Sequence, residues 1–360
     1  MDAPEGLDLV ALRRHLERER PGLLSGELSA RLIAGGRSNL TYAVTDAAGT
    51  TVVVRRPPLG HVLATAHDMT REHRVMSALA ATDVPVPATY LCCADPGVIG
   101  APFYVMERAE GTPYRRAAEL EDLGPQRTRA ISERLVDVLA ELHSVDPAGV
   151  GLADFGRPEG FLPRQVRRWS TQLEHSRSRD LAGVEELHDR LAAAVPVEQR
   201  PAIVHGDYRL DNLLVAPGAS ASPAAGPDAA GHPHEPDRVT AVLDWEMATL
   251  GDPLTDLGLL VVYQQLADLD VSSALVPDVS RAPGHLTTRE QLDRYAVASG
   301  RDVSDLGFYV ALACYKLAVI LEGIHYRYVR GKTLGEGFAE IGGHVEPLID
   351  GGLRALKEQG

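Results

Sequence analysis

The strongest constraint on the fold of this chain is the pair of segments IVHGDYRLDNLLV, residues 203–215, and VTAVLDWEMATLGDPLTDLG, residues 239–258. Of the 31 residues between Asn212 and Asp244, 23 form an insertion, which leaves LLV on one side and VTAVL on the other. Two short apolar runs of this kind predict an antiparallel hairpin. Because Asn212 opens the first strand and Asp244 follows the second, pairing places them at one end, with Asp207 just before them.

The predicted cluster of two carboxylates and one amide indicates a chemistry. Oxygen ligands are poor for zinc but suit Mg²⁺, which prefers carboxylate and amide oxygens together with substrate phosphates. The spacing H-x-D-x-x-x-x-N, followed by a separate Asp after a hairpin, is typical of a kinase catalytic loop. We therefore predict phosphoryl transfer in which Asp207 deprotonates an acceptor hydroxyl, while Asn212 and Asp244 hold metal ions. His205 is expected to brace the loop, and HGD alone would read as a tight turn.

A second signal lies in the helix predicted over residues 66–79. Glu72 interrupts its apolar stripe, and a buried carboxylate needs a cationic partner. The strand TVVVRR offers Arg55 and Arg56 on opposite faces, and Arg55 shares the face of Val53. We predict an Arg55–Glu72 pair that positions nucleotide phosphates. Two ordinary surface arginines are the alternative.

The segment IAGGRSNLTYAV lies where a loop that covers phosphates is expected between two strands. It contains no Walker A motif, and a glycine pair alone is more often a simple turn. The segment YVMER reads as a strand that leads to a hinge where an adenine would bind, or as a plain core strand. The candidate nucleotide-binding residues here are Gly35, Gly36, Ser38, Asn39, Glu107 and Arg108.

The pattern along the chain predicts an α+β protein with two lobes. Residues 1–27 form a helical segment, and residues 28–110 a small nucleotide-binding lobe of antiparallel strands with one helix. Residues 111–360 form a larger, mainly helical lobe for catalysis and acceptor binding. Residues 216–238, in which Pro, Ala and Gly make up 15 of 23 positions, read as a flexible insertion of unknown role.

Composition excludes some classes of partner and predicts the compartment. A formal charge of −14 argues against a general nucleic-acid binder. Cys92, Cys93 and Cys314 do not make a disulfide framework, and the N-terminal residues do not resemble a signal peptide. The longest apolar run, residues 308–321, suits a buried core helix better than a membrane span. We expect a cytoplasmic protein without a membrane span.

These motifs together resemble the aminoglycoside phosphotransferase and choline kinase-like superfamily. The resemblance rests on GGRSNLTY, VVRRPP, REHRVM, APFYVMERAEG, IVHGDYRLDNLLV, VLDWEMATLGDPLTDLG and YKLAVILEGIHYRY. It is greatest to the branch associated with acyl-CoA dehydrogenases, which implies a functional link to such an enzyme. The resemblance implies a bilobal protein-kinase-like fold, ATP or GTP as the donor, Mg²⁺, and transfer to a hydroxyl of a small molecule.

Carried over residue by residue, the resemblance places the base at Asp207, metal ligands at Asn212 and Asp244, and the phosphate-contacting pair at Arg55 and Glu72. It further implies that Asp252 and Asp256, in the GDPxxDL segment, brace the catalytic loop. Two features depart from the family pattern. Many members carry Lys in place of Arg55, and the insertion beside the hairpin is additional.

The acceptor is the least constrained part of the prediction. The candidate acceptor-binding residues are Trp245, Lys316, Glu322 and Tyr326, with core packing and peripheral salt bridges as the alternative. An inward Lys316 favours a hydroxy acid or hydroxyacyl-CoA, whereas an aminoglycoside or amino alcohol would need acidic groups. A catalytically silent nucleotide-binding scaffold and a metal-dependent hydrolase remain open, and the sequence does not predict the oligomeric state.

Overall fold

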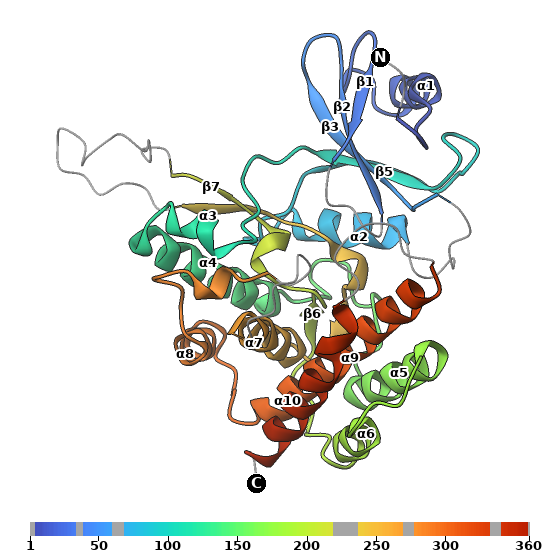
Figure 1. Ribbon diagram of the computed structural model, residues 1–360. Helices are drawn as coiled ribbons and strands as arrows, with labels where there is room; N and C mark the ends of the chain where they lie inside the picture. The colour runs from blue at the N-terminus through green and yellow to red at the C-terminus, as the bar shows by residue number, and fades with distance from the viewer. Residues whose placement is uncertain are drawn as a thin grey trace, which may run out of the picture. The chain divides into compact units, whose positions relative to one another are not determined.

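The structure of the protein is a computed structural model, and it describes residues 4–33, 39–59, 68–218, 237–268, 277–331 and 340–358. The chain forms two compact units. The first consists of Met1–Gly111 together with Thr240–Ala248, and the second of Thr112–Val239 together with Thr249–Gly360 (Figure 1). The division into lobes at residue 110 stays a prediction. In the structure, the distant segment Thr240–Ala248 also belongs to the first unit.

The first unit contains an antiparallel sheet of five strands in the order β1-β2-β3-β5-β4. The strands are β1 Ser29–Leu32, β2 Leu40–Thr45, β3 Thr51–Arg56, β4 Thr89–Cys93 and β5 Phe103–Glu107, and the helices are α1 Leu9–Glu19 and α2 Met69–Leu79. Side chains alternate between the two faces of the sheet. One face forms an apolar core with α1, where Leu12 and Leu16 meet Tyr42, Val54 and Phe103. Helix α2 contacts β4 and β5.

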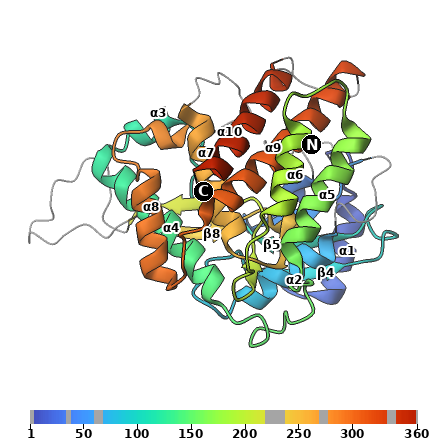
Figure 2. The same cartoon turned by 90° about the horizontal axis from the view of Figure 1, so that it is seen from below.

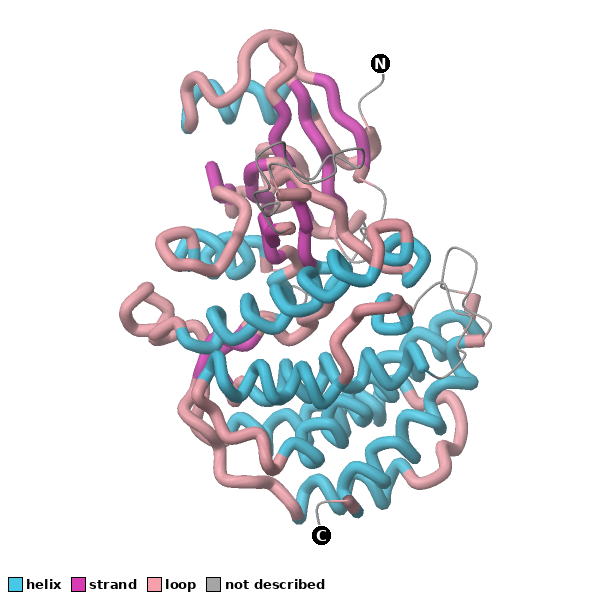
Figure 3. Tube along the Cα trace, turned by 90° about the vertical axis from the view of Figure 1, so that its left-hand side faces the viewer, coloured by secondary structure: helices cyan, strands magenta, loops and turns pink. Residues whose placement is uncertain are grey.

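The second unit is mainly helical; its helices are drawn in cyan in Figure 3. Its helices are α3 Ala117–Glu121, α4 Pro125–Ser144, α5 Phe161–Ser176, α6 Val184–Ala193, α7 Leu254–Asp268, α8 Thr288–Ser299, α9 Leu306–Val329 and α10 Val345–Lys357. Helix α9 packs against α5, α6, α7 and α10, so it forms the centre of this unit (Figure 2). The short strands β6 Ala202–Val204 and β9 Thr249–Gly251 pair antiparallel.

The predicted hairpin is present. Strand β7, Leu213–Ala216, pairs with β8, Arg238–Val242. Asn212 immediately precedes β7, and Asp244 lies two residues beyond β8. Most of the insertion that separates the strands, residues 219–236, lies outside the described residues.

Helix α9 is long and apolar enough to cross a membrane by length and composition, and it is the one such helix among the described residues. Within the structure, however, 72% of its most apolar window is buried. The surrounding helices account for this burial. Helix α9 is therefore a core helix, as the sequence predicts.

These elements confirm the predicted α+β fold class, with an antiparallel sheet near the N-terminus and a helical C-terminal part. The apolar run predicted over residues 308–321 extends in the structure to the 24 residues of α9. The helix predicted over residues 66–79 begins at Met69, where Asp68 caps its N-terminus by accepting from the backbone N–H of Arg71.

The close contact between α7 and α9 depends on one glycine. A Cβ atom added to Gly258 would lie 2.6 Å from the carbonyl atoms of Tyr309. Gly258→Ala should therefore destabilise the protein by about 1–3 kcal/mol, because the helices must separate. Gly323→Ala is the matched control: the nearest contact of its Cβ would be an ordinary 3.5 Å, and it should stabilise by about 0.4–1 kcal/mol. Chemical denaturation of both variants checks this, and equal effects would contradict it.

Candidate active site

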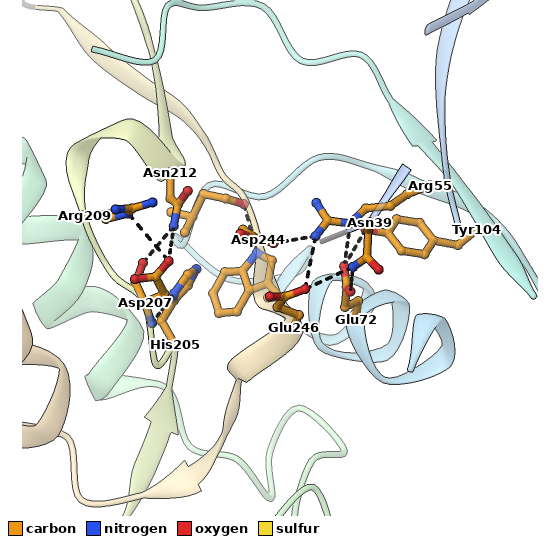
Figure 4. Close-up of polar contacts among 12 residues, drawn as sticks. Asn39, Arg55, Glu72, Tyr104, His205, Asp207, Arg209, Asn212, Asp244 and Glu246 are labelled. Atoms are coloured by element: carbon orange, nitrogen blue, oxygen red, sulfur yellow. Dashed lines mark hydrogen bonds and ion pairs between the residues drawn. The ribbon is translucent and has the colours of Figure 1, made fainter. Parts of the chain in front are cut away.

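Arg55 is the centre of a charged cluster in the first unit (Figure 4). It stands on β3, on the same face as Val53, and lies opposite Thr41 of β2 and Tyr104 of β5. Its Nε lies 3.1 Å from Oε2 of Glu72 on α2, and its Nη2 contacts Asp244. The side-chain contact expected between Arg55 and Glu72 is thus present. Arg56, on the opposite face, instead bonds the carbonyls of Gly6 and Ile99.

Glu72 is almost fully buried, with 1% of its surface exposed. Both of its oxygens are bonded: Asn39 Nδ2 donates to Oε1 at 3.0 Å, and the Tyr104 hydroxyl donates to Oε2 at 2.9 Å. Burial raises the pKa of the Glu72 carboxyl, against the opposite effects of Arg55 and of the Tyr104 hydrogen bond. A buried carboxylate with this many donors is rigid, and it fixes the direction of the Arg55 guanidinium.

Two further acids, Asp244 and Glu246, complete the cluster. Asp244 adopts a left-handed conformation with φ 66°, the one positive φ of a non-glycine residue among the described positions. Asp is among the few residue types that tolerate it, and such backbone strain is typical of functional sites. Glu246 Oε2 accepts from Asn39 Nδ2 at 3.1 Å and lies 3.9 Å from Arg55 Nη2. Arg55 thus lies among three carboxylates, with Glu72 the most deeply buried.

The other residues predicted for nucleotide binding contribute less to this cluster. Gly35, Gly36 and Ser38 lie outside the described residues. Glu107 and Arg108 are exposed, and Glu107 accepts from the backbone N–H of Ala88 at 3.0 Å. Their roles stay predictions. Asn39, predicted as a donor to phosphate, is buried and bonded to Glu72 and Glu246 in the structure.

In the second unit, the loop after β6 is held by a carboxylate of α7. Asp256 accepts from the backbone N–H groups of His205 and Gly206, each at 2.7 Å, and His143 Nε2 lies 3.2 Å from the same carboxylate. Burial raises the pKa of Asp256, but the hydrogen bonds from His143 and from the Gly206 N–H oppose it, and the pKa lies below its ordinary value. Asp256 therefore braces the loop, as the resemblance implies. Asp252 instead accepts from Gln199 N and the Tyr309 hydroxyl, both at 2.9 Å.

The Asp207 side chain projects from this loop and is half-buried (Figure 4). Asn212 Nδ2 donates to the Asp207 carbonyl at 2.9 Å and to its Oδ2 at 3.2 Å. The Tyr263 hydroxyl, from α7, donates to Oδ1 at 2.5 Å. Arg209 lies 3.6 Å from Oδ2 and forms a closer pair, at 3.0 Å, with Asp211. Asp207 and Asn212 are thus in direct contact, as their spacing predicts.

His205 is fully buried. Its Nδ1 accepts the backbone N–H of Asp207 at 3.2 Å, and its ring lies edge-on to that of Tyr208. These contacts stabilise the loop, which fits the bracing role expected from the sequence.

Lys316, on α9, contacts the same loop from the other side. Its ammonium donates to the Gly206 carbonyl and lies 5.7 Å from the centre of the Trp169 ring. Burial lowers the pKa of Lys316, while the charges of Asp207 and Asp256 oppose this shift. Lys316 therefore contacts the residue next to the predicted base, a loop-bracing contact in addition to the acceptor role predicted for it.

The remaining candidates for acceptor binding have structural partners. Glu322 is fully buried and accepts from Ser178 Oγ at 2.6 Å and Arg179 Nε at 3.2 Å. Tyr326 stacks with Arg330, whose guanidinium lies 4.3 Å from its ring centre. Trp245, in the first unit, is buried and donates to the Val242 carbonyl at 2.9 Å. These contacts explain the positions of the three side chains without reference to an acceptor. Their roles in acceptor binding stay predictions.

The donors suited to a metal ion are oxygens. Asn212 uses its amide nitrogen toward Asp207, which leaves its amide oxygen to serve as a ligand, and Asp244 is partly exposed with 30% of its side chain accessible. Among the described residues, no three His, Cys, Asp or Glu side chains gather as a metal-binding cluster. The residue types therefore suit a hard cation that takes further ligands from substrate phosphates.

Several residues of the two clusters were not anticipated from the sequence, among them Glu246, Arg209 and Tyr263. Glu246 and Arg209 lie within two residues of Asp244 and Asp207, but proximity in sequence alone does not indicate a contact. Tyr263 carried one usable signal, since it lies seven residues after Asp256, and both stand on α7 in the structure. That spacing corresponds to two turns and places both side chains on one face.

Comparisons with known proteins found a matching family model, relatives and solved structures of similar fold. A family model described as phosphotransferase enzyme family matches residues 29–222 and 231–295. Acyl-CoA dehydrogenase family member 11 from Gallus gallus is 34% identical over 97% of this chain, which spans 44% of that relative. The chain thus spans less than half the length of this curated relative.

Two solved structures are informative. One from Ralstonia eutropha, provisionally named an aminoglycoside phosphotransferase, is 32% identical with a TM-score of 0.79, and the alignment covers 98% of this chain and 99% of that one. A mutant of aminoglycoside phosphotransferase APH(4)-Ia, in ternary complex with ADP and hygromycin B, shares the fold with a TM-score of 0.57 at 15% identity, covering 95% and 97% of the two chains.

Proposed function

The chain belongs to the phosphotransferase enzyme family, and from this premise we propose that it is a small-molecule kinase that transfers the γ-phosphate of ATP to a hydroxyl group. The observation that carries the proposal is the Asp207 carboxylate. It stands on a loop fixed by Asp256 and Lys316, and its Oδ1 accepts a hydroxyl hydrogen at 2.5 Å. A carboxylate held this way is suited to orient an acceptor hydroxyl and to receive its proton.

ATP is the proposed donor, with GTP as the alternative. The solved structure that contains ADP supports the use of a nucleotide in this fold. In this proposal Arg55, held by Glu72 and Asp244, contacts the nucleotide phosphates. Arginine presents a rigid fork rather than a point charge, so it suits two phosphate oxygens at once.

Mg²⁺ is the proposed metal ion, with Asn212 and Asp244 as its protein ligands. When bound, it would neutralise negative charge on the phosphates of the donor. The protein residues supply the remaining functions: Asp207 takes the proton of the acceptor hydroxyl at its carboxylate, and Arg55 orients the phosphates.

The proposed acceptor is an anionic hydroxy compound, a hydroxy acid or a hydroxyacyl-CoA. Arg209 lies 3.6 Å from Oδ2 of Asp207, and Lys316 contacts the neighbouring Gly206 carbonyl; these basic side chains would disfavour a polycationic aminoglycoside. The name of the Gallus gallus relative is consistent with an acyl compound. A functional link to an acyl-CoA dehydrogenase and a cytoplasmic location belong to the same proposal.

The proposal is tested by offering labelled ATP and Mg²⁺ together with hydroxyacyl-CoAs, hydroxy acids, amino alcohols and aminoglycosides. We expect label on a hydroxyacyl compound or hydroxy acid. Label on an aminoglycoside or an amino alcohol alone would support the runner-up acceptor class. Label that ends only on water would favour a hydrolase, and nucleotide binding without any product would favour a silent scaffold.

A further inference from the structure

One face of α7 holds the loop that carries the predicted base at two points, the backbone of its first residues and the side chain of Asp207. Asp256 binds the backbone N–H groups of His205 and Gly206, and Tyr263 binds the side chain of Asp207. Residues 256 and 263 are two helical turns apart, which separates their backbones by roughly 10 Å along the helix axis. The same rigid helix therefore sets the position of the loop and the direction of its carboxylate.

The side-chain hydrogen bonds to Asp207 occupy one acceptor direction on each of its two oxygens. A carboxylate has two lone-pair directions on each oxygen. Tyr263 takes one on Oδ1 at 2.5 Å, and Asn212 takes one on Oδ2 at 3.2 Å, the oxygen that also faces Arg209. Because Arg209 faces Oδ2, the second direction of Oδ1 is the one suited to a neutral hydroxyl.

Tyr263 itself is held in place and remains a donor. The Arg209 guanidinium lies 5.3 Å from the centre of its ring, in the arrangement of a cation–π contact. Burial raises the pKa of the Tyr263 phenol well above its ordinary value, and the charge of Asp207 raises it further. The phenol therefore stays protonated and donates to the carboxylate. A hydroxyl-to-carboxylate bond of this length is charge-assisted.

We propose that Tyr263 is a positioning residue for phosphoryl transfer: its hydroxyl fixes the Asp207 carboxylate so that the second direction of Oδ1 meets the acceptor hydroxyl. This inference rests on the proposed function, since it assigns Asp207 the role of base. It concerns a residue that neither the motif spacing nor the family resemblance singled out.

The test compares Tyr263→Phe with Tyr208→Phe in the full chain. Tyr208 is adjacent to Asp207 in sequence and fully buried, but its hydroxyl donates to the Leu135 carbonyl at 2.7 Å. Both variants remove one hydroxyl that makes one hydrogen bond, and only one of them touches the base. Steady-state kinetics with the acceptor found for the wild-type protein and thermal unfolding are measured for both.

We expect Tyr263→Phe to lower kcat by about 10- to 100-fold, the range for a lost hydrogen bond to a charged group, with an unchanged KM for the nucleotide. Tyr208→Phe should lower the unfolding temperature and leave kcat near the wild-type value. A purely structural role for Tyr263 would lower its unfolding temperature and spare kcat, which would overturn the inference. A higher kcat in Tyr263→Phe would also overturn it, because the phenol would then compete with the acceptor.

The two proposals fail in different ways. If the wild-type protein transfers phosphate and Tyr263→Phe matches it, the positioning role is wrong while the kinase function stands. If the wild-type protein transfers no phosphate to any acceptor in the panel, the proposed function is wrong, and the role assigned to Tyr263 is wrong with it.

Discussion

Asp207→Asn should abolish measurable transfer while nucleotide binding persists. The asparagine keeps the size of the side chain but does not accept the proton of the acceptor hydroxyl. Loss of a general base lowers the rate by about 10²–10⁴-fold. Nucleotide binding should be retained, because Asp207 is not among the residues that surround Arg55. Product formation and nucleotide titration, measured on the same preparation, check both halves of the prediction.

The matched control for this variant is Asp211→Asn. Asp211 stands in the same loop and pairs with Arg209 at 3.0 Å, so the change removes an equal charge nearby. We expect it to reduce transfer far less than Asp207→Asn does. Equal losses in the two variants would indicate a general electrostatic effect, and retained transfer in Asp207→Asn would show that another group is the base.

Arg55→Met should have the largest effect on stability. It leaves the Glu72 carboxyl, which is 1% exposed, without its cationic partner. Breaking a buried ion pair from one side typically costs about 3–5 kcal/mol. Chemical denaturation should show a loss of this size, and titration with ATP should show no binding, because the phosphate-contacting cation is gone.

A double variant separates stability from function. In Arg55→Met with Glu72→Met both charges of the pair are removed, and replacement of a buried pair by apolar side chains is often neutral. We expect the stability to return toward the wild-type value while ATP binding stays absent. Full ATP binding by this double variant would contradict the role of Arg55, whereas Arg55→Lys, which keeps the charge, should retain binding.

The fold and the Arg55–Glu72 contact were predictable because both rest on short-range periodicity. Arg55 lies on the same face of its strand as Val53, and Glu72 interrupts an apolar stripe along its helix. Each is therefore a charged residue on an otherwise apolar face. The two buried charges are compensated because they pair with each other. The catalytic loop was predictable for a different reason, since the H-x-D-x-x-x-x-N spacing is a recognisable motif; in the structure Asp207 and Asn212 are in contact.

Contacts between distant segments were not predictable. Asn39 and Glu246 are 207 residues apart, and nothing in either neighbourhood indicates the other. Glu322 was expected beside the acceptor because it stands on an apolar helix, but its partners Ser178 and Arg179 lie on a loop some 140 residues earlier. Tyr263 was missed because α7 is apolar on nearly every side, so its sequence shows no distinct face.

The central claim is that the γ-phosphate moves from ATP to a hydroxyl of a small molecule. The most direct measurement uses phosphorus NMR with ATP, Mg²⁺ and a hydroxyacyl-CoA, compared with the same acyl-CoA lacking the hydroxyl. The account predicts a phosphate monoester with the hydroxylated compound, formed together with ADP, and none with its deoxy analogue. ADP and inorganic phosphate as the only products, formed at one rate with both compounds, would contradict it.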